Sequence, residues 1–332
     1  MPKAYTIQAM RLGSARASAT FHSMAFSRSY GEHGNMVWPH DRLRILLASD
    51  LTARSVPAFD RAVELAVSNA AHLRIVHVIR DDLLKDVGEI VYGAADEALQ
   101  RYLADAKAKG AADPEATIIL AGHYDQAIIE ECKQYDAHLV VLGSHRERSV
   151  QDVVLGATME RVLRLGDRPV LVVKSRPRGP YRTILAAVDS SVTSRDALEF
   201  AICLLPRGRF HVLNVYSGLL GEPSEWLGSH EAIARKHEMQ LDAMIETVSR
   251  DVKAELPGAD FTLTAIVDHG DPVEAATRQI GRLKPDLVVV GTHGQTGWVR
   301  ARLGSVARAF LTTMPCDVLA VRPLSRESQS KT

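Results

Sequence analysis

Short apolar, β-branched runs alternate with amphipathic stretches along most of the chain. The first two runs lie at 43–49 and 73–79, and apolar residues at helical spacing follow each of them. Runs of this kind predict buried strands, and the 3.6-residue periodicity between them predicts helices. Strands that alternate with helices imply parallel pairing with right-handed crossovers, so we predict an open, doubly wound α/β fold.

The same alternation occurs twice. Five strands are predicted in each copy, at 43–49, 73–79, 116–120, 138–142 and 170–173, and at 183–188, 210–216, 261–267, 286–290 and 318–321. The longer helical patterns lie at 93–110, 124–135, 229–256 and 272–283. We therefore predict two tandem domains, 41–176 and 180–324, each with a five-stranded parallel sheet. Proline and glycine in 175–180 interrupt regular structure and mark the linker between them.

Direct matches support the repeat. Gly291 lies 148 residues after Gly143, and Gly304 lies 148 residues after Gly156, whereas Asp189 lies 139 residues after Asp50. The second copy therefore has nine more residues between these points. We place them in its longer second helix.

The segment 287–305 combines a strand, a glycine-rich loop and a helix. An apolar run ends in Gly291, Gly294 follows, and Gly304 and Ser305 precede a helical pattern that includes Val306. Glycine lets a backbone approach a ligand, and a helix N-terminus presents unpaired N–H groups and a positive dipole end. The segment therefore predicts a phosphate site. The alternative is a turn followed by an N-cap serine.

The spacing Gly-x2-Gly-x9-Gly-Ser resembles the nucleotide loop of the universal stress protein family, in which the loop holds the ribose and phosphates of ATP. The resemblance extends over about 41–324 and implies an adenine-nucleotide-binding α/β fold (adenine-nucleotide alpha-hydrolase-like, Rossmann-like). It implies that ATP, with or without Mg²⁺, is the cofactor. The residues that it assigns to the nucleotide are Asp189, Val215, Gly291, Gly294, Gly304, Ser305 and Val306.

Two of these assignments concern adenosine. The resemblance places Asp189 at the end of the first strand and gives the backbone of Val215 to adenine, although Asn214 replaces the usual histidine before it. Ser191 and Ser194 follow Asp189 closely, so a turn or N-cap role for this aspartate is the alternative.

The first copy departs from the loop pattern. Arg146 stands where the second copy has Gly294, and Ala157 stands where it has Ser305. The loss of a hydroxyl donor to a charged group removes about 1.5–3 kcal/mol of binding free energy. We expect a degenerate loop here; an anion site formed by Arg146 and Arg148 is the alternative.

Composition and charge narrow the function classes. Lys+Arg and Asp+Glu are balanced at 40 each, which argues against a broad nucleic-acid or membrane interface. No apolar run is long enough for a membrane span. The three cysteines are far apart, so we expect buried core residues in a reducing, cytoplasmic protein. His145 and His293 have no second ligand at metal spacing, so no metal site is predicted.

Residues 1–40 differ in composition from the rest. They are basic, rich in serine and alanine, and aperiodic. Such a segment is compatible with a transit peptide, a disordered tail, or a start codon that is truly Met36. We favour the last two readings and expect this segment to contribute little to the fold.

Three function classes remain. The first is a nucleotide-binding stress sensor or adaptor with an unknown protein partner; the second is a slow ATPase or nucleotidyl-transfer enzyme; the third is an interaction module without a ligand. The loop 292–303 contains no acid, which favours binding over catalysis. The resemblance also implies that the two copies pair through their last strands as an internal pseudo-dimer, and a homodimer of the whole chain is a further possibility.

Overall fold

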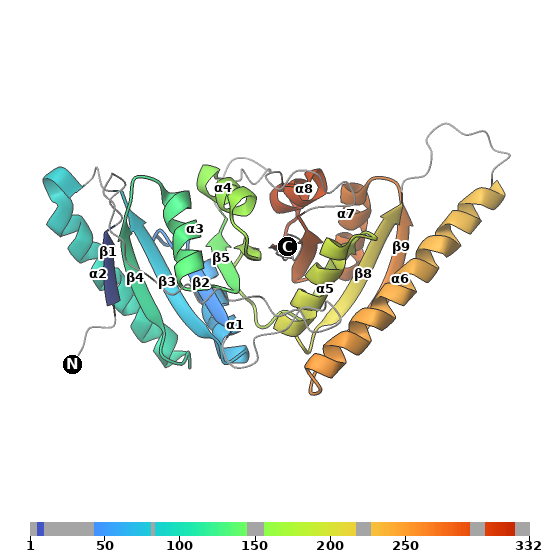
Figure 1. Ribbon diagram of the computed structural model, residues 1–332, viewed down its shortest axis with the longest axis horizontal. Coiled ribbons are helices and arrows are strands. Elements are labelled where there is room, and N and C mark those ends of the chain that lie inside the picture. Colours follow the sequence, from blue (N-terminus) through green and yellow to red (C-terminus); the bar gives the residue numbers. More distant parts are fainter. Residues whose placement is uncertain are drawn as a thin grey trace, which may run out of the picture.

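The computed structural model contains one continuous sheet of eleven strands. It describes residues 5–9, 43–80, 84–144, 156–216, 227–292 and 303–322. The strand order is β1-β4-β3-β2-β5-β6-β11-β10-β7-β8-β9. Figure 1 shows the two copies side by side along this sheet, with the helices on its two faces.

The first copy provides five parallel strands and four helices. The strands are β2 (Arg44–Ala48), β3 (His72–Ile79), β4 (Glu115–Leu120), β5 (Leu139–Gly143) and β6 (Val170–Val173). The helices are α1 (Val56–Ser68), α2 (Leu84–Ala108), α3 (Tyr124–Gln134) and α4 (Ala157–Leu165).

The second copy repeats this arrangement. Its strands are β7 (Thr183–Val188), β8 (Arg209–Tyr216), β9 (Thr262–His269), β10 (Leu287–Gly291) and β11 (Asp317–Val321). Its helices are α5 (Val192–Leu204), α6 (Leu227–Glu255), α7 (Pro272–Leu283) and α8 (Ser305–Thr313). The predicted doubly wound α/β architecture is confirmed in both copies.

The longer second helix explains only part of the length difference between the copies. Helix α6 has 29 residues and α2 has 25. The connection before the helix also differs in length, because 217–226 lie between β8 and α6 in the sequence, whereas only 80–83 lie between β3 and α2. The prediction that the helix accounts for all of the difference is therefore wrong.

The two copies meet through their last strands. Strands β6 and β11 pair antiparallel, with Leu319 opposite Leu171 and Val318 opposite Val172. All four of these side chains are fully buried. The expected pairing of the last strands is present, and it merges two five-stranded parallel sheets into one, since each strand supplies the hydrogen-bonding partner that the other would lack at an open edge.

A further strand comes from the N-terminal extension. The sequence pattern predicts no regular element before residue 41, but β1 (Tyr5–Ala9) pairs in parallel with β4. Tyrosine, threonine and isoleucine favour strands, and the outer edge of β4 offers unpaired backbone groups. The rest of 1–40 lies outside the described residues.

Both faces of the sheet are buried. Helices α1, α2, α5 and α6 pack on one face, and α3, α4, α7 and α8 pack on the other. Alternate residues of one strand enter opposite cores, as Ile45 and Leu46 of β2 do. Cys132 and Cys203 are buried in these cores as predicted, and burial raises the pKa of each thiol to about 12, whereas Cys316 is only partly buried.

A buried polar cluster beside the paired strands forms contacts between the two copies. Asp317, at the start of β11, accepts hydrogen bonds from the Lys174 backbone N–H at 2.8 Å and from the Tyr181 hydroxyl. Arg61 of α1 lies with its Nε 3.8 Å from the same carboxylate, and its guanidinium stacks 3.7 Å from the centre of the Tyr181 ring. The cluster therefore joins the first copy, the end of the linker and the second copy. We define Asp317, Arg61 and Tyr181 as the junction cluster.

Candidate functional site

The sheet order of the second copy reverses between β7 and β10. The chain runs outward from β7 through β8 to β9, and then returns to β10 on the other side of β7. Ligands of open α/β sheets bind beyond the carboxyl ends of the strands at such a point. Asp189 directly follows β7 and Gly291 ends β10, and Ala187 and Val290 of the two strands are register partners. The fold therefore brings these two predicted residues together.

The carboxylate of Asp189 is half-buried and held by one oxygen. Its Oδ1 accepts hydrogen bonds from the backbone and hydroxyl of Ser191 and from the Ser194 hydroxyl, the last at 2.6 Å. Ser191 is also the N-cap of α5. Asp189 thus stabilises the turn before α5, which was the predicted alternative to nucleotide binding. None of the described residues donates a hydrogen bond to Oδ2, so the turn role and ligand binding are compatible.

Backbone hydrogen bonds hold the residues that flank the glycine loop, Thr292 and Gly304. The Gly304 N–H donates to the carbonyl of Thr292 at 2.8 Å, and the Thr292 N–H donates to Val321 of β11 at 2.8 Å. A Cβ on Gly304 would lie 2.9 Å from that Thr292 carbonyl oxygen, and one on Gly291 would lie 3.2 Å from Thr193. Both glycines are therefore needed for close packing. Thr292, only 1% exposed, was missed in the sequence because a threonine in a loop carries no signal.

The first turn of α8 follows directly after Gly304. Gly304 is the N-cap of α8 and forms no side-chain capping bond, while Ser305 is the first helical residue and is exposed. The alternative of an N-cap serine is therefore wrong. No acidic side chain occupies the first turn. Val306 is partly buried and packs on the core. This arrangement leaves the helix N-terminus able to attract an anion.

Three side chains contact one another in series at the end of β8, next to Val215. The Asn214 amide donates to the carbonyl of Val188 at 3.0 Å, and its Oδ1 lies 2.8 Å from Nδ1 of His237 on α6. The His237 ring stacks on Tyr216 with centroids 5.1 Å apart. His237 could not be predicted from sequence, because helix periodicity does not show which strand residue a side chain meets.

The first copy keeps parts of this framework. His77 Nδ1 contacts the carbonyl of Ser49 at 2.9 Å, as Asn214 contacts Val188. A carbonyl only accepts, so Nδ1 carries the proton, and burial lowers the pKa of His77. His77 is therefore a hydrogen-bonded, partly buried structural residue. Asp50 is exposed, and its Oδ1 accepts hydrogen bonds from the backbone N–H and the hydroxyl of Thr52.

Several predicted positions lie outside the described residues. They are Gly294 and His293 in the second copy, and His145, Arg146 and Arg148 in the first. Within the described parts of the chain, no three His, Cys, Asp or Glu side chains come together as a metal site. No helix in those parts has the length and apolarity that crossing a membrane requires.

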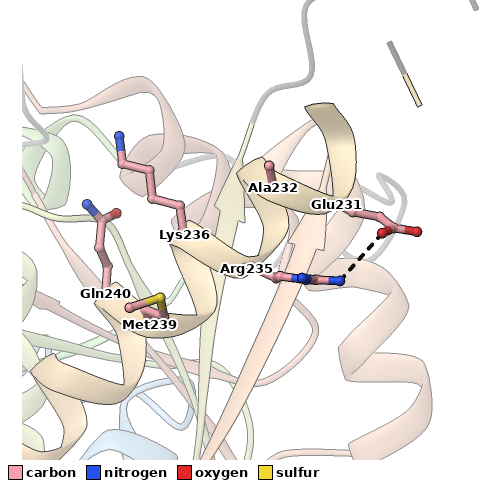
Figure 2. A pocket seen from close by; sticks show the side chains of 6 residues that line it. All are labelled: Glu231, Ala232, Arg235, Lys236, Met239 and Gln240. Atoms are coloured by element: carbon pink, nitrogen blue, oxygen red, sulfur yellow. Dashed lines mark ion pairs between the residues drawn. The ribbon is translucent and has the colours of Figure 1, made fainter. Parts of the chain in front are cut away.

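A separate hollow of about 460 Å³ lies along the N-terminal half of α6. Figure 2 shows its six lining residues, all of them on α6, with Glu231 and Arg235 paired at 3.6 Å. It contains no residue of the predicted nucleotide site. We assign no ligand to this hollow. The candidate site is the group of residues at the carboxyl ends of β7 and β10.

Comparison with known proteins finds one family. The sequence model of the universal stress protein family matches residues 42–174 and 180–322. The chain is 25% identical over 246 residues to universal stress protein E homolog of Haemophilus influenzae, which covers 69% of this chain and 76% of that protein. It is 32% identical over 148 residues to universal stress protein A homolog 1 of Coxiella burnetii, covering 42% of this chain and 96% of that protein.

A solved structure shows the same fold across both copies. The crystal structure of a universal stress protein from Archaeoglobus fulgidus superposes with a TM-score of 0.62 at 17% identity. The match covers 84% of this chain and 98% of that one. At this identity the likeness concerns the fold alone.

Proposed function

Because the chain belongs to the universal stress protein family, we propose that it binds ATP through its second copy and acts as a cytoplasmic stress-response sensor or adaptor. The observation that carries this proposal is the contrast between the two loops. The second copy has Gly294 and Ser305 where the first has Arg146 and Ala157. A glycine keeps the loop open for phosphate, and the serine adds a hydroxyl donor.

The phosphates would lie at the N-terminus of α8. Gly304 and Ser305 present this helix end without a side-chain cap or an acidic first turn. The unpaired N–H groups and the dipole favour a polyanion there. Gly291 and Gly294 would let the backbone approach the phosphates closely. These groups explain affinity for phosphate but do not by themselves select adenine.

The adenosine end would lie at the carboxyl ends of β7 and β8. Oδ2 of Asp189 has the position and charge to accept hydrogen bonds from a ribose or base donor. The backbone of Val215 has the place that the family resemblance assigns to adenine contact. Tyr216, the next residue, stacks on His237. Adenine, a flat ring with donor and acceptor edges, suits a backbone edge beside aromatic rings.

Binding without turnover is favoured over catalysis. The loop 292–303 contains no carboxylate that could activate water or hold Mg²⁺ beside the terminal phosphate. Asp189 is committed through one oxygen to the turn before α5. A slow ATPase or nucleotidyl transferase is the second candidate, and Mg²⁺ would then accompany ATP. A protein partner, or a second copy of the chain, would receive the signal.

Titration of ATP into the full chain, with calorimetric detection, tests the proposal. We expect one site per chain. Gly294→Arg copies the first loop into the second and should abolish binding, because a side chain fills the phosphate space. The matched control is Arg146→Gly, which changes the equivalent position of the first copy and should leave the affinity and the single site unchanged.

Melting temperatures of both variants should equal that of the parent chain, which would show that the fold is intact. Two equal sites, or loss of binding only with a change in the first loop, would contradict the proposal. Release of phosphate by the parent chain but not by Gly294→Arg would favour the enzyme instead. The full chain is required because separating the copies would expose the buried strands β6 and β11.

A further inference from the structure

A basic residue directly after each last strand contacts the other copy. Lys174 directly follows β6 and Arg322 directly follows β11. They are 148 residues apart, which is the offset that relates the two glycine loops. The two residues therefore hold equivalent positions about the junction of the copies.

Lys174 binds the C-terminal end of α8. Its ammonium donates to the carbonyl of Met314 at 2.6 Å and lies 3.4 Å from that of Phe310. The side chain is buried, with 7% exposure, and Phe310 is fully buried. An ammonium is costly to bury, so these carbonyl contacts compensate for the water that it loses.

Arg322 forms the reciprocal contact with α4. Its guanidinium donates to the carbonyls of Arg164, at 2.7 Å, and Gly166 at the C-terminal end of that helix. A cation at a helix C-terminus satisfies carbonyls that lack intrahelical partners and complements the negative end of the dipole. Each copy thus supplies a cation to the C-terminal end of a helix of the other.

The two helices concerned are those that follow the glycine loops. Helix α8 begins at Ser305, where the intact loop returns, and α4 begins at Ala157, where the degenerate loop returns. Helix α8 has nine residues, so its ends are only about 13 Å apart. A short, packed helix moves as a unit, and its C-terminal anchor therefore sets the position of its N-terminus.

The helices are also joined directly. Arg308 of α8 pairs with Glu160 of α4 at 3.3 Å. These residues are again 148 positions apart, so opposite charges occupy equivalent places on the two copies. Figure 1 shows α4 and α8 next to each other above the junction. The junction is therefore in physical contact with the phosphate end of the proposed site through α8.

We propose that Lys174 is a positioning residue for the nucleotide site of the second copy, so that the first copy helps to set the affinity of that site. The inference rests on the proposed function, because it concerns the same site. The inference gives the first copy a role. Through Lys174 the first copy holds α8 in the orientation in which the N–H groups near Ser305 face the phosphates.

The test compares three variants of the full chain. Lys174→Met keeps the length of the buried stem but removes the cation, and we expect ATP affinity to fall about three- to tenfold, in the range of a helix-terminus charge effect. Lys174→Arg should restore affinity because it retains a donor and a charge. Arg322→Met, the matched control, removes the equivalent cation from α4 and should leave ATP affinity unchanged.

Amide hydrogen exchange gives a second readout that does not need nucleotide. Lys174→Met should speed exchange mainly in α8, and Arg322→Met should speed it mainly in α4. Equal ATP affinity in Lys174→Met and the parent chain would overturn this inference alone. Equal weakening by Lys174→Met and Arg322→Met would also overturn it, because a general loosening of the junction would then suffice. A parent chain that binds no ATP would overturn the proposed function first.

Discussion

Replacing Asp317 with alanine is expected to lower the free energy of unfolding by about 2–4 kcal/mol. Asp317 is 3% exposed and accepts hydrogen bonds from the Lys174 backbone and the Tyr181 hydroxyl. Its removal would leave both donors buried without this acceptor. It would also take a carboxylate from beside Arg61, which is 4% exposed. An uncompensated buried cation is among the largest single-residue penalties.

The loss of unfolding free energy in Asp317→Ala is limited, because Arg61 keeps two other partners. Its guanidinium also contacts Glu64 at 2.8 Å and the Gly179 carbonyl at 3.0 Å. For a chain of this length the change corresponds to a melting temperature roughly 4 °C lower by scanning calorimetry. Asp317→Asn keeps an acceptor of the same shape and should lose less.

Glu231→Ala, which removes an ion pair whose side chains are 76% and 77% exposed, serves as the control and should cause no measurable change. An Asp317→Ala chain that melts with the parent would show that the junction cluster adds nothing to stability.

Stability of the second copy should fall as pH rises toward 7 and above, and Glu199 is the expected cause. Glu199 of α5 is 3% exposed. Burial, with Asp196 and Asp251 nearby, raises the pKa of its carboxyl from 4.5 to about 7, although the Arg195 guanidinium 3.0 Å away acts in the opposite direction. The folded chain therefore holds a proton at pH values where the unfolded chain has released it.

The sign follows from this difference in bound protons. The stabilisation from protonated Glu199 is complete below about pH 4.5 and is lost as pH rises through about 7. Glu199→Gln keeps the neutral shape at every pH, so it should flatten the stability profile between pH 5 and 8. At pH 8 the variant should exceed the parent by about 2–3 kcal/mol, and at pH 5 the two should be close.

Urea unfolding of both chains at the two pH values measures this difference. Glu238→Gln, a change of the same charge on an exposed residue of α6, controls for net charge. Parallel profiles for the parent and Glu199→Gln would contradict the assignment.

The sequence by itself determined the local elements and their repetition. Alternating apolar runs placed the strands, because a strand buried on both faces must be apolar along its length. Because the strands are parallel and their crossovers are right-handed, the carboxyl ends of the strands lie at one edge of the sheet, and Asp189, Gly291 and Gly304 are expected there. The loop pattern then identified the family. The same reasoning placed the whole length difference between the copies in the second helix, although α6 has 29 residues and α2 has 25.

The tertiary structure alone decided which distant residues meet. His237 reaches Asn214, Lys174 reaches Met314 and Asp317 reaches Tyr181 across separations that local periodicity does not encode. The same holds for the strand at Tyr5–Ala9, which forms because β4 offers an open edge. Such contacts depend on how whole elements pack. A polar group that is buried in this way needs a hydrogen-bond partner, and here the partner comes from the other segment.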